Sequence, residues 1–182
     1  MIPPFDHNNV LPPFLTTPAD QRGQSPYPCD IMEFCKHFAT SSVRIEILRG
    51  FVKFRLDCIE HNIVGKQWVD GSFVESIENS ESRDPHDIDV VTLYVVKDKL
   101  EEELIMSSFP EFVYFYKSKS KYNVDHYPVL VNEDPYRTVE LTKYWSSLFS
   151  HNRRGVWKGM VEIPLYNTVD KDKEALDYIN SL

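Results

Sequence analysis

The segment 87–96 is the most strand-like part of the chain, and it limits what the chain can fold into. It reads Asp-Ile-Asp-Val-Val-Thr-Leu-Tyr-Val-Val, and such runs of β-branched and other apolar residues favour a β-strand. The polar segment 75–86 before it carries turn-forming residues and predicts a loop. We therefore expect a fold built on a sheet, with one strand that begins at two acidic residues, Asp87 and Asp89.

Two longer helices are predicted from apolar residues at spacings of three and four. The first runs from Ser42 to about His61, and its expected buried face is Val43, Ile47, Phe51, Phe54 and Cys58. The second begins at Asp134 and Pro135, which supply a capping side chain and a proline at the first helical position. Its expected core-facing stripe is Leu141, Tyr144, Trp145, Leu148 and Phe149.

The remaining predicted elements are shorter. We expect two helices and three strands, with the helices over 97–106 and 170–182 and the strands over 67–70, 122–131 and 160–163. Pro128 has no N–H to donate, so the strand that contains it should lie at an edge of the sheet or carry a bulge. Together these elements predict an α+β fold with about four strands and four helices.

The first 30 residues have a different composition from the rest. They hold seven of the twelve prolines, including two similar pieces, Ile2-Pro-Pro-Phe5 and Leu11-Pro-Pro-Phe14. Proline fixes φ and removes a donor, so we expect an extended proline-rich arm over 1–30. Its apolar side chains suggest that it packs along residues 31–182, which we expect to form a single domain. The alternative is a polyproline II segment that binds a partner.

Composition argues against several classes of protein. The 28 acidic and 20 basic residues give a net charge of −8, whereas a broad, non-specific nucleic-acid binder needs clustered cations. The three cysteines form no Cys-x-x-Cys pair, which argues against a disulfide framework and a zinc site. We see no signal peptide and no apolar run of the roughly 20 residues that span a bilayer. We therefore expect a soluble, cytoplasmic protein without membrane insertion, of open oligomeric state.

Acidic residues supply the first candidate site. Asp87 and Asp89 are two residues apart on a strand, so their side chains share one face, about 6–7 Å apart at the backbone. A divalent cation such as Mg²⁺, which prefers oxygen ligands, would stabilise such a pair; the alternative is a solvated strand entrance. Asp125 adds a third acid within an apolar strand, where an acid usually has a partner or a metal. The turn Gly71-Ser72 presents N–H groups and a hydroxyl that suit phosphate oxygens.

Gly71-Ser72, a spacer, Asp87-x-Asp89 and the later Asp125 together resemble the active-site pattern of the DNA polymerase β-like nucleotidyltransferases. The Pro-Pro-Phe pieces, the stretch Trp-Val-Asp-Gly-Ser-Phe-Val and the tail Phe149-x-x-x-Arg153-x-Gly155-x-x-Lys158-Gly159 are similar to a group of small bacterial nucleotidyltransferase-like proteins of undefined function. The resemblance spans most of the chain. It implies a nucleotidyltransferase-like fold, with a small mixed sheet of about four strands flanked by helices.

The resemblance also implies roles for these residues. Asp87 and Asp89 would bind two Mg²⁺ (or Mn²⁺) ions, with Asp125 at the ion that activates the attacking hydroxyl. Gly71 and Ser72 would hold the β- and γ-phosphates of a nucleoside triphosphate, whose α-phosphate is attacked with release of pyrophosphate. One departure is the 14-residue spacer between Ser72 and Asp87, which is longer than usual in the related small proteins. It leaves the position of Ser72 relative to the metals open.

Three lysines precede the third aspartate. Lys117, Lys119 and Lys121 alternate with serines, and on an extended segment they would form a basic stripe that leads to Asp125. A solvated hairpin turn is the simpler interpretation of this segment. Lys121 is nonetheless a candidate contact for phosphate or acceptor.

Arg153, Arg154 and Lys158 form a second basic cluster, after the helix that contains Trp145. Arg153 and Lys158 are further candidate contacts for phosphate or acceptor. The alternative is that these charges complement the dipole at the C-terminal end of that helix.

Two histidines adjoin the acids. His86-Asp87 lacks the other ligands that a His-Asp phosphohydrolase would need. His126 should face the opposite side of its strand from Asp125 and is therefore expected to be structural rather than a base.

These observations lead to competing hypotheses about function. The first is a template-independent nucleotidyltransferase that uses a nucleoside triphosphate, with an oligonucleotide, an RNA or a protein hydroxyl as acceptor. Antiviral defence or a toxin–antitoxin pair is its expected setting, by analogy alone. The alternative is a catalytically silent module of the same fold that binds nucleotide or a partner protein. Substitution of Asp87 or Asp89 should abolish transfer under the first hypothesis and leave partner binding intact under the second.

Overall fold

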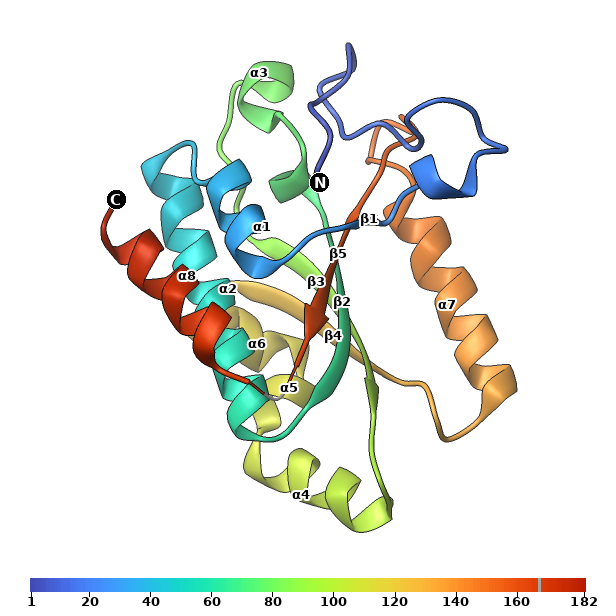
Figure 1. The fold of residues 1–182 in the computed structure, drawn as a ribbon, viewed down its shortest axis with the longest axis vertical. Helices are drawn as coiled ribbons and strands as arrows, with labels where there is room; N and C mark the ends of the chain where they lie inside the picture. The colour runs from blue at the N-terminus through green and yellow to red at the C-terminus, as the bar shows by residue number, and fades with distance from the viewer. Residues whose placement is uncertain (167) are drawn as a thin grey trace.

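A mixed, open sheet forms the centre of the computed structural model, which describes residues 1–166 and 168–182 (Figure 1). Its five strands are β1 (Tyr27–Pro28), β2 (Val64–Asp70), β3 (Ile88–Val95), β4 (Val124–Leu130) and β5 (Val161–Leu165). They lie in the order β1-β5-β2-β3-β4. β2 runs antiparallel to β3 and β5, whereas the pairs β1–β5 and β3–β4 are parallel. The α+β prediction is confirmed, with β1 as a strand that sequence patterns did not predict.

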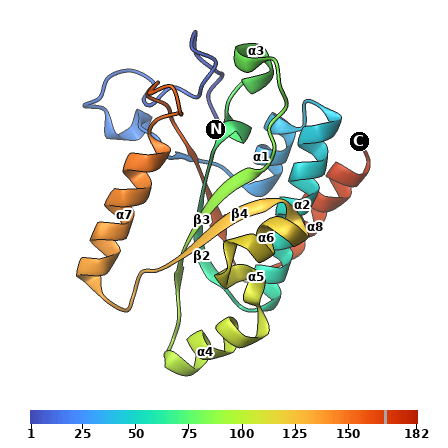
Figure 2. The same ribbon diagram turned by 180° about the vertical axis from the view of Figure 1, so that it is seen from behind.

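Helices cover both faces of the sheet. The described residues form α1 (Ile31–Phe38), α2 (Ser42–Glu60), α3 (Ile77–Glu81), α4 (Lys99–Ser108), α5 (Pro110–Val113), α6 (Phe115–Tyr122), α7 (Pro135–Phe149), α8 (Asp170–Asn180) and two 3₁₀-helices, η1 (Gln21–Gly23) and η2 (Ser72–Val74). Figures 1 and 2 show α1, α2, α6 and α8 on one side of the sheet and α7 alone on the other. The first side buries the large apolar core. The second buries a small cluster made by Trp68, Val91, Val129, Trp145, Phe149 and Met160.

The helix α2 supports the large core as its sequence pattern predicts. Four residues of the predicted face are at most 2% exposed: Ile47, Phe51, Phe54 and Cys58. Burial of one such side chain contributes about 1.5–3 kcal/mol. Gly50 allows close packing here, because a Cβ at this position would lie 2.0 Å from the carbonyl oxygen of Tyr122 at the end of α6. A side chain at position 50 would therefore push α6 away from α2.

Two details of the predicted strands and caps are confirmed. β4, which contains Pro128, is an edge strand. The side chain of Asp134 caps α7 by accepting hydrogen bonds from the backbone N–H groups of Tyr136 and Arg137.

The predicted core-facing stripe of α7 is only partly buried. Trp145 and Phe149 are buried, whereas Tyr144 is 57% exposed and Leu148 is 50% exposed. The reason is that α7 packs against the small cluster alone, which covers only the inner side of the helix.

Two segments predicted as loop or extended chain are helical. The predicted loop 75–86 contains α3, whose Ile77 is 1% exposed and fixes this short helix to the protein. The lysine-rich segment forms neither a basic stripe nor a hairpin turn, because it lies in α6. Ser118 and Tyr122, four residues apart, are the buried side chains that give this segment its helical period.

The first thirty residues are not uniformly extended. They contain η1 and the strand β1, which joins the edge of the sheet beside β5. Val10 and Leu11 are fully buried, and the carbonyl oxygen of Leu11 accepts a hydrogen bond of 2.7 Å from the N–H of Gly159.

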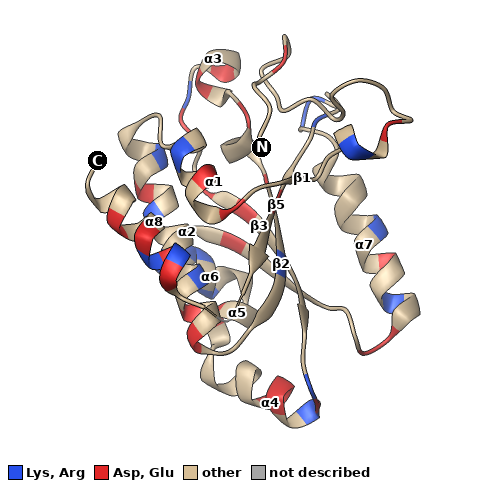
Figure 3. Ribbon diagram, viewed as in Figure 1, with Lys and Arg blue, Asp and Glu red and all other residues tan. Residues whose placement is uncertain are grey.

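Acidic and basic residues are mixed along two of the outer helices. Figure 3 shows acidic and basic residues interspersed along α7 and along α8. The three cysteines are buried and unpaired. Among the described residues, no helix combines the length and the apolar character that crossing a membrane requires.

Candidate functional site

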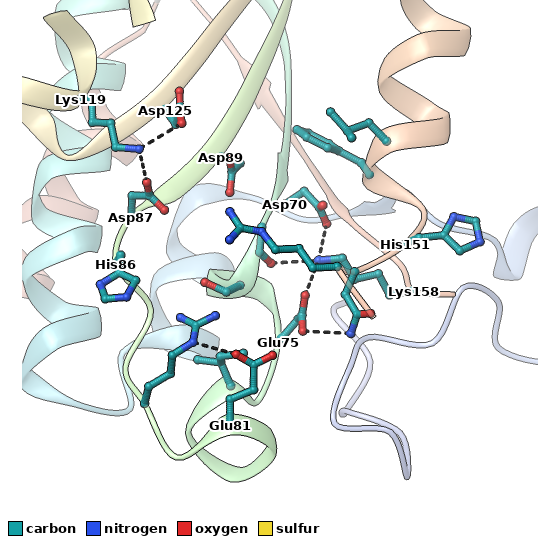
Figure 4. A pocket seen from close by; sticks show the side chains of 18 residues that line it. Asp70, Glu75, Glu81, His86, Asp87, Asp89, Lys119, Asp125, His151 and Lys158 are labelled. Atoms are coloured by element: carbon teal, nitrogen blue, oxygen red, sulfur yellow. Dashed lines mark hydrogen bonds and ion pairs between the residues drawn. The ribbon is translucent and has the colours of Figure 1, made fainter. Parts of the chain in front are cut away.

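Four carboxylates meet at one end of the sheet, on the face covered by α7. The strand register pairs Asp70 with Asp89 across β2 and β3, and pairs Asp89 with Asp125 across β3 and β4. Cross-strand partners share a face, and Asp87 shares it too because it lies two residues before Asp89. All four side chains line one cavity of about 730 Å³ (Figure 4). The three predicted acids thus come together, with Asp70 as a fourth.

The walls of the cavity are formed by the turn after β2, the segment before β3 and the end of α7. The residues around the four acids include most of the other predicted site residues and several new ones: Gly71, Ser72, Glu75, Ile77, Glu81, Arg83, His86, Lys119, Leu148, Phe149, His151, Asn152, Arg153 and Lys158. The long spacer before Asp87 therefore does not carry Ser72 away from the acids.

Gly71 fits closely against Asp89. Its φ of +80° lies in a region that favours glycine. A Cβ at position 71 would lie 1.8 Å from Oδ2 of Asp89. Only glycine therefore allows the turn to pass this close to the carboxylate, and Ser72 follows directly as the start of η2.

A buried ion cluster lies beneath this turn. Nζ of Lys158 is 2.8 Å from Oε1 of Glu75 and 3.1 Å from Oδ1 of Asp70, and it donates a hydrogen bond of 2.9 Å to the carbonyl oxygen of Gly71. The three charged side chains are at most 5% exposed. The ammonium of Lys158, a predicted phosphate contact, is thus engaged in ion pairs that hold the turn.

Lys119 occupies the space between the two outer acids. Its Nζ lies 2.6 Å from Oδ2 of Asp87 and 3.2 Å from Oδ2 of Asp125. Oδ1 of Asp125 is buried and has no hydrogen-bond partner among the described residues. The basic residue at the third aspartate is therefore Lys119.

Lys121, the lysine predicted for this role, lies elsewhere. It does not line the cavity, and it forms ion pairs with Asp57 at 3.3 Å and with Glu111 at 3.4 Å. Residues two apart on a helix point about 200° apart, so the helical form of α6 separates Lys121 from Lys119.

The acids strongly influence one another. Burial raises the pKa of Asp89 to about 7, with further contributions from the charges of Asp87, Asp70 and Asp125. Burial also raises the pKa of Asp70 to about 6, despite the opposing effect of Lys158. The hydrogen bond to Asp87, together with Asp125, raises the pKa of Lys119 above its ordinary value. Near neutral pH the cavity therefore carries unbalanced negative charge, which a bound cation would relieve.

The carboxylate oxygens of the cavity are ligands that suit a hard cation. In this structure the ammonium of Lys119 holds two of these acids, Asp87 and Asp125, in place. Within residues 1–166 and 168–182, no three acidic, histidine or cysteine side chains are arranged as a metal-binding group. The ammonium of Lys119 lies where a cation between Asp87 and Asp125 would lie. The unpartnered oxygen of Asp125 and the raised pKa of Asp89 fit oxygen ligation of Mg²⁺ or Mn²⁺, provided that Lys119 moves aside.

The two histidines differ in position. His86 lines the cavity. His126 is fully buried on the opposite face of β4, where its ring nitrogens lie 2.8 Å from Oγ1 of Thr92 and 2.9 Å from the carbonyl oxygen of Phe112. Burial lowers the pKa of His126 to about 3. Its predicted position, facing the opposite side of the strand from Asp125, is confirmed.

A pH effect on stability follows from Asp89. The pKa of Asp89 in the folded protein, about 7, exceeds the ordinary value of 3.8. The contribution of protonated Asp89 to the free energy of unfolding is therefore complete below about pH 4 and is lost as the pH rises through 7. We expect Asp89→Asn, measured by urea unfolding in EDTA, to be more stable than the wild type at pH 8 by on the order of 2 kcal/mol. The difference should shrink towards pH 5. Equal free energies of unfolding for Asp89→Asn and the wild type at pH 8 would contradict the raised pKa of Asp89.

Sequence reasoning missed Asp70, Glu75 and Lys119 as members of the site. Asp70 had a recognisable signal, because it is an acid at the end of an apolar strand, directly before Gly71. Lys119 was predicted only as one of three lysines in a basic stripe leading to Asp125, which is six residues away. Glu75 had no signal, since its partner Lys158 is distant in the sequence.

Comparison with known proteins adds one finding. A family model described as "Family of unknown function (DUF6932)" matches residues 3–164, which is most of the chain. No curated protein and no solved structure matches the chain.

Proposed function

The chain belongs to the DUF6932 family, and we propose that it is a metal-dependent nucleotidyltransferase. It would transfer a nucleoside monophosphate from a nucleoside or deoxynucleoside triphosphate to a hydroxyl acceptor, without a template. The observation that carries this proposal is the convergence of Asp87, Asp89 and Asp125 with the turn Gly71-Ser72 in one cavity. The resemblance to the DNA polymerase β-like nucleotidyltransferases assigns chemistry to the same residues.

The acids would provide the metal site. Asp87, Asp89 and Asp125 would hold Mg²⁺ or Mn²⁺, whose charge stabilises both the attacking and the leaving oxygen when bound. Asp125 lines the cavity beside the other two acids and would accept the proton of the acceptor hydroxyl once Lys119 has moved off its Oδ2. The hydroxyl oxygen then bonds to the α-phosphorus as the bond to the bridging oxygen breaks and pyrophosphate leaves.

The rest of the cavity would bind the triphosphate. Ser72 lines the cavity directly after Gly71, whose backbone lies close to Asp89, and its hydroxyl and the neighbouring N–H groups would donate hydrogen bonds to the outer phosphates. Arg83 and Arg153 line the cavity as well, and their guanidinium groups suit phosphate recognition. The buried cluster around Lys158 would keep the turn in position.

A direct test is to incubate the protein with each nucleoside and deoxynucleoside triphosphate, labelled at the α-phosphate, together with Mg²⁺ or Mn²⁺. Products are resolved on a denaturing gel and by mass spectrometry of the nucleotides and of the intact protein. Label that enters a larger product only when metal is present supports the proposal. The absence of product with every donor, combined with no metal binding by titration, would refute it.

Lys119 supports a second candidate, a silent module in which its ammonium takes the place of the metal. Under the transferase proposal, Mn²⁺ displaces Lys119 and binds the wild type, and Lys119→Ala binds Mn²⁺ more tightly because the competing ammonium is gone. We expect a gain of about tenfold, equivalent to roughly 1.4 kcal/mol, in a calorimetric titration.

The matched control is Lys117→Ala, which removes a lysine of the same helix that does not line the cavity. Mn²⁺ binding by Lys119→Ala alone, with none by the wild type, would favour the silent module.

A further inference from the structure

Six aromatic rings form a continuous row beside the cavity. They contact one another in the order Tyr114, Tyr116, Phe115, Tyr127, Trp145 and Tyr144, with ring centroids 4.7 to 6.0 Å apart. We call these six residues the aromatic strip. Four of them are 45–57% exposed: Tyr114, Phe115, Tyr116 and Tyr144. The two middle rings, Tyr127 and Trp145, belong to the small apolar cluster, so the strip presents exposed rings at its two ends.

The strip adjoins the acids at two points. Tyr127 lies two residues beyond Asp125 in β4, so both side chains point to the same face of the sheet. Trp145 packs against Phe149 with ring centroids 5.5 Å apart, and Phe149 lines the cavity. A polymer strand that stacks on the exposed ring of Phe115 is thus separated from Asp125 by the ring of Tyr127.

Lysines accompany the rings. Nζ of Lys117 lies 5.4 Å from the centre of the Tyr114 ring. Lys119, two residues further along α6, is ion-paired with Asp87 and Asp125, and Lys143, next to Tyr144 on α7, is ion-paired with Glu140. The lysine that contacts a ring of the strip is therefore Lys117. Flat exposed rings next to ammonium groups are the elements with which proteins bind single-stranded nucleic acids, because bases stack on the rings and phosphates pair with the cations.

We infer that the aromatic strip binds single-stranded nucleic acid and presents its 3′-hydroxyl to Asp125 as the acceptor. The inference rests on the proposed function and names its acceptor class. Stacking gives affinity that tolerates any base sequence. In the transfer, the 3′-oxygen bonds to the α-phosphorus, its proton passes to Asp125 and pyrophosphate leaves.

Binding can be measured without transfer. Fluorescently labelled oligo(dT), oligo(U) and a duplex, each of about 10 nucleotides, are titrated with the full chain in Mg²⁺ without any triphosphate. We expect saturable binding of the single strands and weaker binding of the duplex, whose bases are already stacked on each other. The DNA and RNA arms show which strand is preferred.

Variants of the strip separate stacking from general apolar contact. Phe115→Leu keeps an apolar side chain but loses the ring, and Tyr144→Ala removes a second ring. Each should weaken binding by about tenfold, whereas Phe115→Trp should retain it. The control is Tyr166→Ala, because Tyr166 is a tyrosine of similar exposure, 58%, outside the strip. Circular dichroism confirms that each variant is folded.

Several results would overturn the inference. One is the absence of saturable binding up to roughly 100 µM, where even non-specific binders are detected. Another is an unchanged affinity in Phe115→Leu, and a third is a protein partner that needs the strip while no oligonucleotide binds.

Failure of the strip and failure of the transferase remain distinguishable. If label is transferred to another acceptor and no strand binds, the strip is not a nucleic-acid site, but the proposed transferase activity stands. Strand binding that never leads to transfer with any donor would keep the binding site and remove the transferase.

Discussion

Asp89→Asn should lower the rate of nucleotidyl transfer by on the order of a thousandfold or more, because the amide carries no charge and ligates Mg²⁺ poorly. Asp89 lies at the centre of the acids, paired in register with both Asp70 and Asp125. Its side chain has the same shape as asparagine, so the close fit against Gly71 is kept. The measurement is the initial rate of label transfer from the best donor at saturating metal.

Asp84→Asn is the matched control for this variant. Asp84 is exposed, lies five residues earlier and does not line the cavity. It undergoes the same chemical change and should keep the wild-type rate. Full activity of Asp89→Asn, in a protein that binds Mn²⁺ as the wild type does, would place the chemistry outside the row of acids.

The largest effect on stability is expected from Lys158→Met. Methionine has a similar length but no charge, so Asp70 and Glu75 would be left buried without their shared partner. Removal of one partner from a buried ion cluster costs about 3–5 kcal/mol. We expect a loss of this size in urea unfolding at pH 8, with a smaller loss at pH 5, because Asp70, with a pKa of about 6, can then accept a proton.

Lys66→Met provides the comparison. Lys66 also forms a carboxylate ion pair, with Glu162 at 2.7 Å, but its side chain is 59% exposed. An exposed pair contributes about 0–1 kcal/mol, so this variant should unfold nearly as the wild type does. Similar losses in the two lysine variants would show that the cluster under Gly71 does not stabilise the turn.

Local patterns were enough to predict the two longest helices and four of the five strands in the described residues, but α1, α3, α5 and α6 were not predicted. The spacing of Ile47, Phe51 and Phe54 predicted α2, and the acid–proline pair at Asp134 predicted the start of α7. These features depend on residues within one or two turns of each other. The reliance on local patterns also explains the wrong prediction for α6. The alternating lysines suggested an extended segment or a turn, whereas burial of Ser118 and Tyr122 requires a helix.

The site itself was only partly predictable. Asp87 and Asp89 could be placed on one face because the period of a strand fixes their directions. The row from Asp70 to Asp125 depends on the register of three strands, which no local pattern contains. Likewise, Lys158 reaches Glu75 across 83 positions of sequence. Contacts of this kind are set by the packing of the whole chain.

The most direct measurement is a crystal structure of the protein with Mn²⁺ and a non-hydrolysable nucleoside triphosphate. We predict anomalous density for Mn²⁺ at Asp87, Asp89 and Asp125, with Lys119 moved off the carboxylates and the outer phosphates beside Ser72. Nucleotide and Mn²⁺ bound elsewhere, with Lys119 still between Asp87 and Asp125, would contradict the assignment of this cavity as the active site.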